Sequence, residues 1–182
     1  MIKLIDLIKE GSYSYGCAML YFDFPQINKI HNIINPDHVY KDENDPSFGL
    51  ETEPHCTLLY GFHQEIQSYD IKKVLKNHTF STCKLHNVSL FENEKYDVLK
   101  YDVGYPTRSG EFLHKCNKEL SKYPHTTNFP DYHPHLTIAY LKPGMGSKYV
   151  EVLKNQEFEL TPQYAVYSHP NGSKTKIEIQ IK

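Results

Sequence analysis

Several features are scarce or missing in this sequence, and each absence excludes a class of protein. The chain has no tryptophan and only 4 cysteines among 182 residues, and its formal net charge is −2. No apolar run approaches the roughly 20 residues of a membrane-spanning helix, and the N-terminal residues lack the apolar stretch of a secretory signal. The near-neutral charge argues against binding of long nucleic acid. We therefore expect a cytoplasmic protein that binds neither membranes nor long nucleic acid.

The cysteines point to a reducing compartment. They are Cys17, Cys56, Cys83 and Cys116, and no two of them form a C-x-x-C pair. Without a secretory signal, reduced thiols are the better interpretation. Hydrophobic residues make up 39% and charged residues 23%, which is typical of a globular chain. No linker or low-complexity segment divides it, so we expect a single domain over residues 1–182.

The hydrophobic pattern alternates between helical and strand periods, which favours an α+β fold. Helical spacing predicts helices over 2–9, 26–34, 70–77, 109–122 and 147–154. Strands are predicted over 16–24, 55–62, 80–91, 95–103, 135–141, 157–168 and 174–181. The segment 35–53 is rich in Asp, Asn and Pro, which indicates a long surface loop.

Two segments, 80 residues apart, repeat the same pattern. Pro54-His-Cys-Thr-Leu-Leu-Tyr60 and Pro134-His-Leu-Thr-Ile-Ala-Tyr140 both read P-H-x-T, then two apolar residues, then Tyr. A further H-x-T match at His125 is not followed by an apolar strand. A single short match is weak, but the shared context of the other two predicts two related lobes.

Strand geometry gives the spacing a reason, because alternate side chains point to the same face. His55 and Thr57 should share one face of their strand, as should His135 and Thr137. The residues expected on the opposite faces, in packing, are Leu58, Tyr60, Ile138 and Tyr140. If a pseudo-twofold axis relates the two strands, both His-Thr pairs converge on one cleft.

Two histidines and two threonines suit the cleavage of a phosphodiester. One imidazole takes a proton from the attacking hydroxyl or water, and the other gives a proton to the leaving oxygen. Threonine hydroxyls donate to phosphate oxygens, where charge grows in the transition state. This chemistry requires neither a metal nor a cofactor. We assign the catalytic roles to His55, Thr57, His135 and Thr137, and leave open which histidine is the acid.

Other interpretations remain open at this point. His125, His133 and His135 are candidate zinc ligands, but no matched acidic residue or cysteine completes a set, and a metal site ignores the repeat. Tyr13 and Tyr15 are candidates for stacking on a base, or else pack against the N-terminal helix. A protein that binds a nucleotide without turning it over is a further alternative.

The two motifs resemble the signature of the two-histidine (2H) phosphoesterase superfamily. That resemblance implies a bilobal α+β fold, with two antiparallel sheets related by a pseudo-twofold, flanking helices and a central cleft. It also implies metal-independent phosphodiester chemistry on 2′,3′-cyclic phosphates, or on linkages beside a 2′-hydroxyl. Fold-level resemblance does not fix a substrate.

A narrower resemblance concerns the phrases YGCAMLYF, EPHCTLLYGF, YHPHLTIAYLKPG and YSHPNGSKTKIE. They are similar to phage-encoded 2H proteins, among them anti-CBASS nucleases that degrade the cyclic di- and trinucleotide signals of bacterial defence. This resemblance implies a small anionic nucleotide, a cyclic oligonucleotide, as substrate, with the 2′-hydroxyl as nucleophile and a 3′-phosphate as final product. It does not imply a protein partner. An RNA-end 2′,3′-cyclic phosphodiesterase is the alternative within the same chemistry.

Overall fold

The computed structural model describes residues 15–104, 111–129 and 131–182, and most of their strands belong to one antiparallel sheet. The order across the sheet is β7-β4-β5-β6-β2-β1-β8-β9. Its strands are β1 (Gly16–Phe22), β2 (His55–Phe62), β4 (Cys83–Glu92), β5 (Asp97–Gly104), β6 (His135–Leu141), β7 (Phe158–Leu160), β8 (Pro162–Ser168) and β9 (Lys174–Ile177). A small parallel pair, β3 (Thr79–Phe80) and β10 (Gln180–Ile181), lies apart from this sheet. The helix expected over 2–9 lies outside the described residues.

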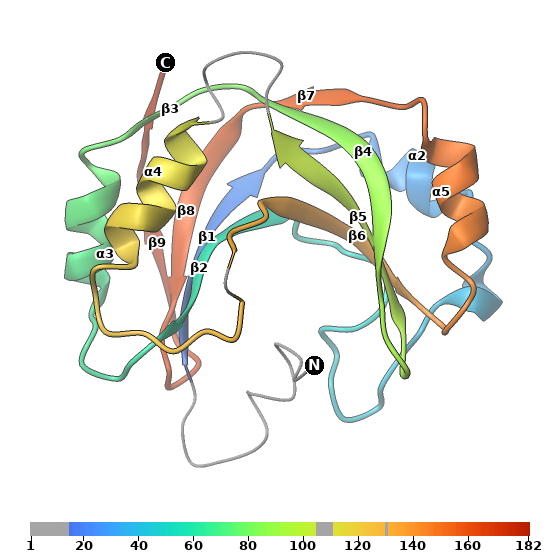
Figure 1. Ribbon diagram of the computed structural model, residues 1–182, viewed down its shortest axis with the longest axis horizontal. Helices are drawn as coiled ribbons and strands as arrows, with labels where there is room; N and C mark the ends of the chain where they lie inside the picture. Colours follow the sequence, from blue (N-terminus) through green and yellow to red (C-terminus); the bar gives the residue numbers. More distant parts are fainter. Residues whose placement is uncertain (1–14, 105–110, 130) are drawn as a thin grey trace.

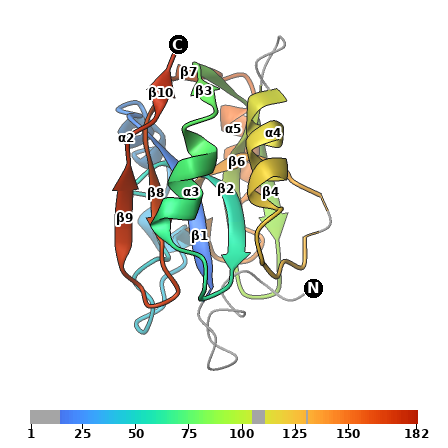
Figure 2. The ribbon, with the colours of Figure 1, turned by 90° about the vertical axis from the view of Figure 1, so that its left-hand side faces the viewer.

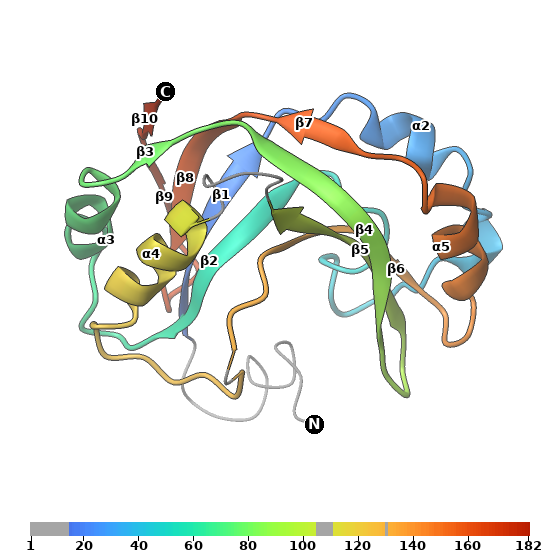
Figure 3. The same ribbon diagram turned by 45° about the horizontal axis from the view of Figure 1, so that its top comes forward.

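The sheet consists of two four-stranded halves that meet at a single point. One half is β7-β4-β5-β6 and the other is β2-β1-β8-β9. Between them, β2 and β6 pair only at Cys56 and Leu136. Figure 1 shows the resulting arch, and Figure 3 shows β4 and β5 along the half that ends in β7. The α+β class is confirmed, and the two expected sheets are halves of one sheet.

Where β2 and β6 diverge, two long loops, the segment 35–53 and the segment before β6, form backbone hydrogen bonds with these strands. Part of the 35–53 loop lies along β6, since Tyr140 N donates to Gly49 O at 2.8 Å and Glu51 N donates to Ile138 O at 2.9 Å. The loop before β6 lies along β2 in the same way, with Thr126 N donating to Gly61 O at 2.9 Å. The segment predicted as a plain surface loop is therefore partly an edge of the sheet.

Helices cover one face of the sheet, and two of them cross to the opposite half. The helices are α2 (Ile27–His31), α3 (Ser68–Leu75), α4 (Glu111–Leu120) and α5 (Ser147–Leu153), with a short 3₁₀ turn at Pro36–His38. α2 follows β1 but packs on β6, whereas α4 follows β5 but packs on β2. Figures 1 and 2 show α3 and α4 together on one half, with α2 and α5 on the other. None of the helices in the described ranges is long and apolar enough to cross a membrane.

The apolar side chains beneath these helices form one core cluster that runs through both halves. On the sheet side, the cluster includes the residue between the histidine and the threonine of each motif. These residues are Cys56 and Leu136, and both are fully buried. The opposite face, which we call the histidine face, carries His55, Thr57, His135 and Thr137, all partly exposed. The alternation predicted from the sequence therefore holds for the first three residues after each proline.

A β-bulge then interrupts the alternation at the same place in each copy. Thr57 lies opposite Met19 but Leu59 lies opposite Ala18, so Leu58 is an extra residue in the ladder. Likewise Thr137 lies opposite Lys100 and Ala139 opposite Leu99. Because a bulge adds one residue, both apolar residues of each copy enter the core.

The bulge also overturns one expectation. Tyr60 and Tyr140 do not continue the core side of their strands: they pair with Cys17 and Val98, on the histidine-face side. The extra residue shifts the two-residue period by one, so a strict count from His55 or His135 gives the wrong face beyond the bulge. Leu58 and Ile138 face the core as predicted.

At each bulge a crossing helix donates a hydrogen bond to a backbone carbonyl, which in the case of Ile138 also accepts from Glu51 N. Asn117 of α4 donates its side-chain amide to Leu58 O at 2.7 Å. His31 of α2 donates from Nε2 to Ile138 O at 3.1 Å. A buried carbonyl without a partner costs about 1–3 kcal/mol, so these contacts couple helix placement to the shape of the motif strands.

We expect Asn117→Ala to lower the free energy of unfolding by about 1–2 kcal/mol, since the lost hydrogen bond outweighs a gain in helix propensity of about 0.5 kcal/mol. Urea unfolding measures the change. Lys118→Ala, at the exposed neighbouring position of α4, is the control and should stay within about 0.5 kcal/mol of the parent. Equal stability of the two variants would show that the Leu58 carbonyl does not depend on Asn117.

Candidate active site

Both motifs begin at a proline that opens a strand. Phe22 N donates to Pro54 O at 2.9 Å, and Val103 N donates to Pro134 O at 2.9 Å. A proline has no N–H to contribute to a ladder, so the start of a strand is a position where it is tolerated. The carbonyl still accepts a bond from the neighbouring strand. The proline of the repeat thus sets where each motif strand begins.

The pairing of Cys56 with Leu136 brings the four polar residues together. In an antiparallel pair at this register, His55 lies across from Thr137, and Thr57 lies across from His135. All four side chains project from the histidine face at the junction of the two halves. The charge of His55 is one of the lesser contributions to the lowered pKa of His135.

The two imidazoles are held by the same local contact. Nδ1 of His55 donates to Glu53 O at 2.8 Å, and Nδ1 of His135 donates to His133 O at 2.8 Å. A carbonyl can only accept, so each neutral ring keeps its proton on Nδ1 and leaves Nε2 for chemistry. His125 makes the same contact with Tyr123 O. The contact therefore orients a histidine but does not by itself identify a catalytic one.

The His55 side of the site is aromatic and apolar. Tyr21 stacks on His55, with ring centroids 5.4 Å apart, and Tyr164 stacks on Tyr21 at 5.3 Å. Met19 and Val166 pack beside them in a small cluster separate from the main core. Burial, with the nearby Glu53 and Glu51 charges, raises the pKa of the Tyr21 hydroxyl above its ordinary value. Tyr21 therefore stays a neutral phenol at working pH.

One carboxylate also approaches His55. Glu51 places Oε2 3.7 Å from Nδ1 of His55, while Glu53 places Oε2 3.6 Å from Nζ of Lys174. Both glutamates precede the first motif. The backbone carbonyl of Glu53 orients His55, and its own side chain faces Lys174.

The His135 side carries an ion pair between a buried lysine and a partly exposed aspartate. Lys100 and Asp102 pair directly, and both lie on β5 facing β6, opposite Thr137 and His135 respectively. Phe91 contacts His135 edge-on, with ring centroids 4.9 Å apart. Burial lowers the pKa of His135 most, with the charges of Lys100 and His55 adding to it; the His133 carbonyl and Asp102 oppose the shift. His135 is therefore a neutral imidazole at pH 7.

The remaining sequence candidates fall outside this group. Tyr13 lies outside the described residues, so its role stays a prediction. Tyr15 lies just before β1 and packs against Tyr60 and His63, with ring centroids 6.1 Å away in each case. A role in base stacking stays a prediction for it too. Burial raises the pKa of the Cys56 thiol to about 12, which rules it out as a nucleophile.

Several neighbours of the histidines were not found from the sequence, among them Tyr21, Lys100 and Asp102. All three lie in segments predicted as strands, and the alternation of side chains along a strand assigns each residue to one of its two faces. Which residue lies beside which histidine depends on the pairing register of β1 with β2 and of β5 with β6. That register is a long-range property that the local pattern does not carry.

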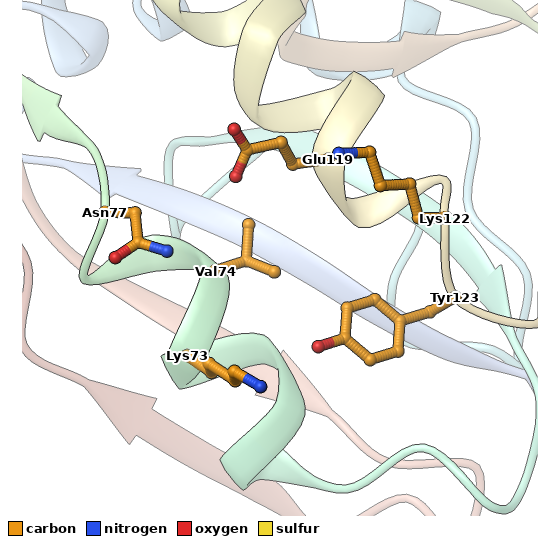
Figure 4. A pocket seen from close by; sticks show the side chains of 6 residues that line it. All are labelled: Lys73, Val74, Asn77, Glu119, Lys122 and Tyr123. Carbon is orange, nitrogen blue, oxygen red and sulfur yellow. The ribbon is translucent and has the colours of Figure 1, made fainter.

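Two other parts of the described structure differ from the motif junction in what they offer a ligand. Among the residues placed by the structure, no three His, Cys, Asp or Glu side chains gather as a metal site would need, and His125, His133 and His135 form no such group. A shallow hollow between α3 and α4 lies on the helix-covered side of the sheet (Figure 4). Its lining is Lys73, Val74, Asn77, Glu119, Lys122 and Tyr123. Neither place contains a motif residue other than His135.

Comparison with known proteins supports the fold. No protein-family model and no curated protein sequence matches the chain. Among solved structures, Usb1 of Kluyveromyces marxianus is similar with a TM-score of 0.57 at 11% identity, over 91% of this chain and 98% of that one. Its structure with uridine monophosphate gives 0.57 at 12% identity, over 91% and 98%. E. coli LigT complexed with 3′-AMP gives 0.49 at 13% identity, over 91% and 96%.

The likeness to Usb1 covers nearly the whole of both chains, so the fold class that the motifs implied is confirmed. The identity is low, and the likeness extends to the fold alone.

The lowered pKa of His135 predicts a change of stability with pH. The folded state binds this proton less readily than the unfolded chain, whose histidine has a pKa of about 6.5. Stability from this group is therefore complete above about pH 6.5 and is lost as pH falls through the lowered folded pKa. We expect His135→Gln to show a smaller loss of unfolding free energy between about pH 7.5 and about pH 5 than the parent, measured by urea unfolding. An equally steep loss in both proteins would contradict the lowered pKa.

Proposed function

We propose that this protein is a metal-independent phosphodiesterase that cleaves cyclic di- and trinucleotides beside a 2′-hydroxyl. The observation that carries the proposal is the antiparallel pairing of Cys56 with Leu136 at the junction of the two halves, a register that puts His55 across from Thr137 and Thr57 across from His135. Two imidazoles with Nδ1 held by backbone carbonyls and two hydroxyls on one face supply what phosphodiester cleavage needs.

The first step is a transesterification. The 2′-oxygen attacks the adjacent phosphorus while Nε2 of one histidine takes its proton. The bond from phosphorus to the leaving 5′-oxygen breaks, and the other histidine, protonated at Nε2, gives its proton to that oxygen. The products are a 2′,3′-cyclic phosphate and a free 5′-hydroxyl, and no electrons leave or enter the reacting groups. Each proton transfer of this kind contributes about 10²–10⁴-fold to the rate.

The second step reverses the roles of the two histidines. Water attacks the cyclic phosphate and loses a proton to the histidine that had become neutral. The bond from phosphorus to the 2′-oxygen breaks, and that oxygen takes a proton from the other histidine, leaving a 3′-phosphate. Thr57 and Thr137 donate to the non-bridging oxygens in both steps, where negative charge increases in the transition state.

The substrate class rests on several observations. The four quoted phrases resemble phage-encoded nucleases that act against cyclic-oligonucleotide defence, and this motivates the proposed role in evading that defence inside an infected bacterium. Usb1, which shares the fold, has been solved with uridine monophosphate, a ligand of nucleotide size. The net charge of −2 suits a small anionic ligand better than a long polyanion. We propose Tyr13 and Tyr15 as base contacts.

Two other functions are kept as outcomes of the tests. An RNA-end 2′,3′-cyclic phosphodiesterase would use only the second step. A binding protein would retain the nucleotide unchanged, but binding alone requires neither proton-transfer group, and both are present here. We propose that one domain, residues 1–182, carries this single site.

We expect His55→Ala and His135→Ala each to lower kcat by at least about 10²-fold, because each removes one proton-transfer group. The wild type should keep its activity in excess chelator. His125→Ala is the matched control, since His125 makes the same backbone contact outside the site, and it should retain full activity. Full activity in either motif variant would contradict the assignment. If the wild type lost activity in chelator and the His125→Ala variant was also inactive, the two results would favour a zinc site.

A substrate panel tests the proposed specificity. The protein is incubated in chelator with cyclic di- and trinucleotides and with one RNA that ends in a 2′,3′-cyclic phosphate, and products are identified by mass spectrometry. We expect linear products with a 3′-phosphate from the cyclic oligonucleotides, and none from the double variant His55→Ala, His135→Ala. Conversion of the RNA end alone would replace the proposed substrate, and a bound but unchanged ligand would indicate sequestration.

A further inference from the structure

The buried lysine beside His135 has no part in the two-step reaction described above. Lys100 is only 6% exposed, and it lies on the histidine face directly opposite Thr137. Directly opposed residues of an antiparallel pair have Cβ atoms roughly 4.5–5.5 Å apart. A phosphate that accepts a hydrogen bond from Thr137 therefore lies within reach of a lysine side chain at position 100.

The ion pair of this lysine is poorly placed to stabilise the fold. Lys100 and Asp102 are two residues apart on the same strand, so their contact connects no separate elements of the structure. Burial of the lysine charge carries a desolvation penalty, and a single partner that is itself partly exposed, as Asp102 is, offsets it poorly. The Lys100 ammonium also contacts another strand, at the ring of Phe91 on β4, whose centroid lies 4.7 Å from Nζ. An apolar residue at position 100 could pack on that ring equally well, so this contact does not by itself require a lysine.

Asp102 is itself held from the neighbouring strand. Asn87 donates its side-chain amide to Asp102 Oδ2 at 2.5 Å, while Lys100 bonds to the other oxygen. Asn87 is an extra residue in β4, between His86 and Val88, and has a positive φ of 50°. Bulges of this kind re-aim side chains next to functional sites. The carboxylate is therefore fixed from two directions, and it fixes the ammonium group in turn.

The other half of the sheet has no such pair. Opposite Thr57 and His55 stand Met19 and Tyr21, the positions that correspond to Lys100 and Asp102. They belong to the apolar cluster with Val166. The two halves thus present the same motif residues with different neighbours, a charged pair on β5 and an apolar and aromatic surface on β1.

We propose that Lys100 is a further phosphate-binding residue of this site, held in place by Asp102, and that it fixes the direction in which the nucleotide binds. The proposal rests on the proposed function. The ammonium has three N–H groups, of which one bonds to Asp102, so the others can donate to a phosphate oxygen shared with Thr137. The phosphate then lies toward β5, and the nucleoside lies over Met19, Tyr21 and Val166.

The test compares uridine 3′-monophosphate with uridine, which differ only in the phosphate. In Lys100→Met, we expect the Kd for the monophosphate to rise about tenfold, because a charge-assisted hydrogen bond is lost. The Kd for uridine should stay within about twofold, and Lys100→Arg should restore most of the affinity for the monophosphate. Lys84→Met is the control, since Lys84 pairs with Glu157 on the far edge of the same half, and it should alter neither Kd.

A second measurement needs no substitution and applies even if the variant does not fold. In the wild type, titration with inorganic phosphate should shift the NMR signals of the Lys100 side chain and leave those of Lys84 unchanged. The assignment of Lys100 is overturned if its signals do not respond to phosphate. It is also overturned if a folded Lys100→Met variant keeps the wild-type Kd, or loses affinity for uridine as much as for the monophosphate.

The results separate this proposal from the proposed function. Phosphate binding that depends on Lys100, in a wild type that turns over no member of the substrate panel, would overturn the proposed function and retain the role of Lys100 as a phosphate ligand. Turnover by the wild type, with a phosphate preference that Lys100→Met leaves intact, would overturn the role of Lys100 alone.

Discussion

The arrangement of the site depends on one backbone pairing, between Cys56 and Leu136. Both residues are fully buried on the helix-covered face, so their side chains fix which way the neighbouring residues point. A slip of one residue would turn a histidine and a threonine into the core, where burial of an unpaired polar group is costly. The register is therefore protected by the core itself, and the positions of both imidazoles follow from it.

Each position of the repeated motif has its own physical reason. The proline opens the strand with a carbonyl but no N–H, the histidine and threonine share the polar face, and the residue between them enters the core. The two apolar residues that follow are both buried because of the bulge. The carbonyl that the bulge displaces is bonded by Asn117 in one half and by His31 in the other. Corresponding contacts thus recur in both halves, whereas the pseudo-twofold axis itself stays a prediction.

The local pattern of the sequence was enough to find the motif strands and the face of His55, Thr57, His135 and Thr137, because a two-residue period is a local property. It failed at Tyr60 and Tyr140, since nothing local in the sequence marks the bulge. The pattern also did not predict that Tyr21 and Lys100 lie beside the histidines, because their placement depends on pairing between strands that are distant in the sequence. The local pattern also did not predict that part of the 35–53 loop lies along β6. The backbone partners of that segment lie about ninety residues away in the chain.

The crossing helices have a consequence for how such a chain can be divided. α2 leaves the half that contains β1 and covers β6, and α4 leaves the half that contains β5 and covers β2. A polypeptide with only one half would therefore carry a helix with no strand of its own to cover, and a motif strand with no helix over it. Two copies of such a half-length chain would meet both needs by lending each other their helices, as in a domain-swapped dimer. In this fold, the continuous chain keeps each motif strand together with the helix that covers it.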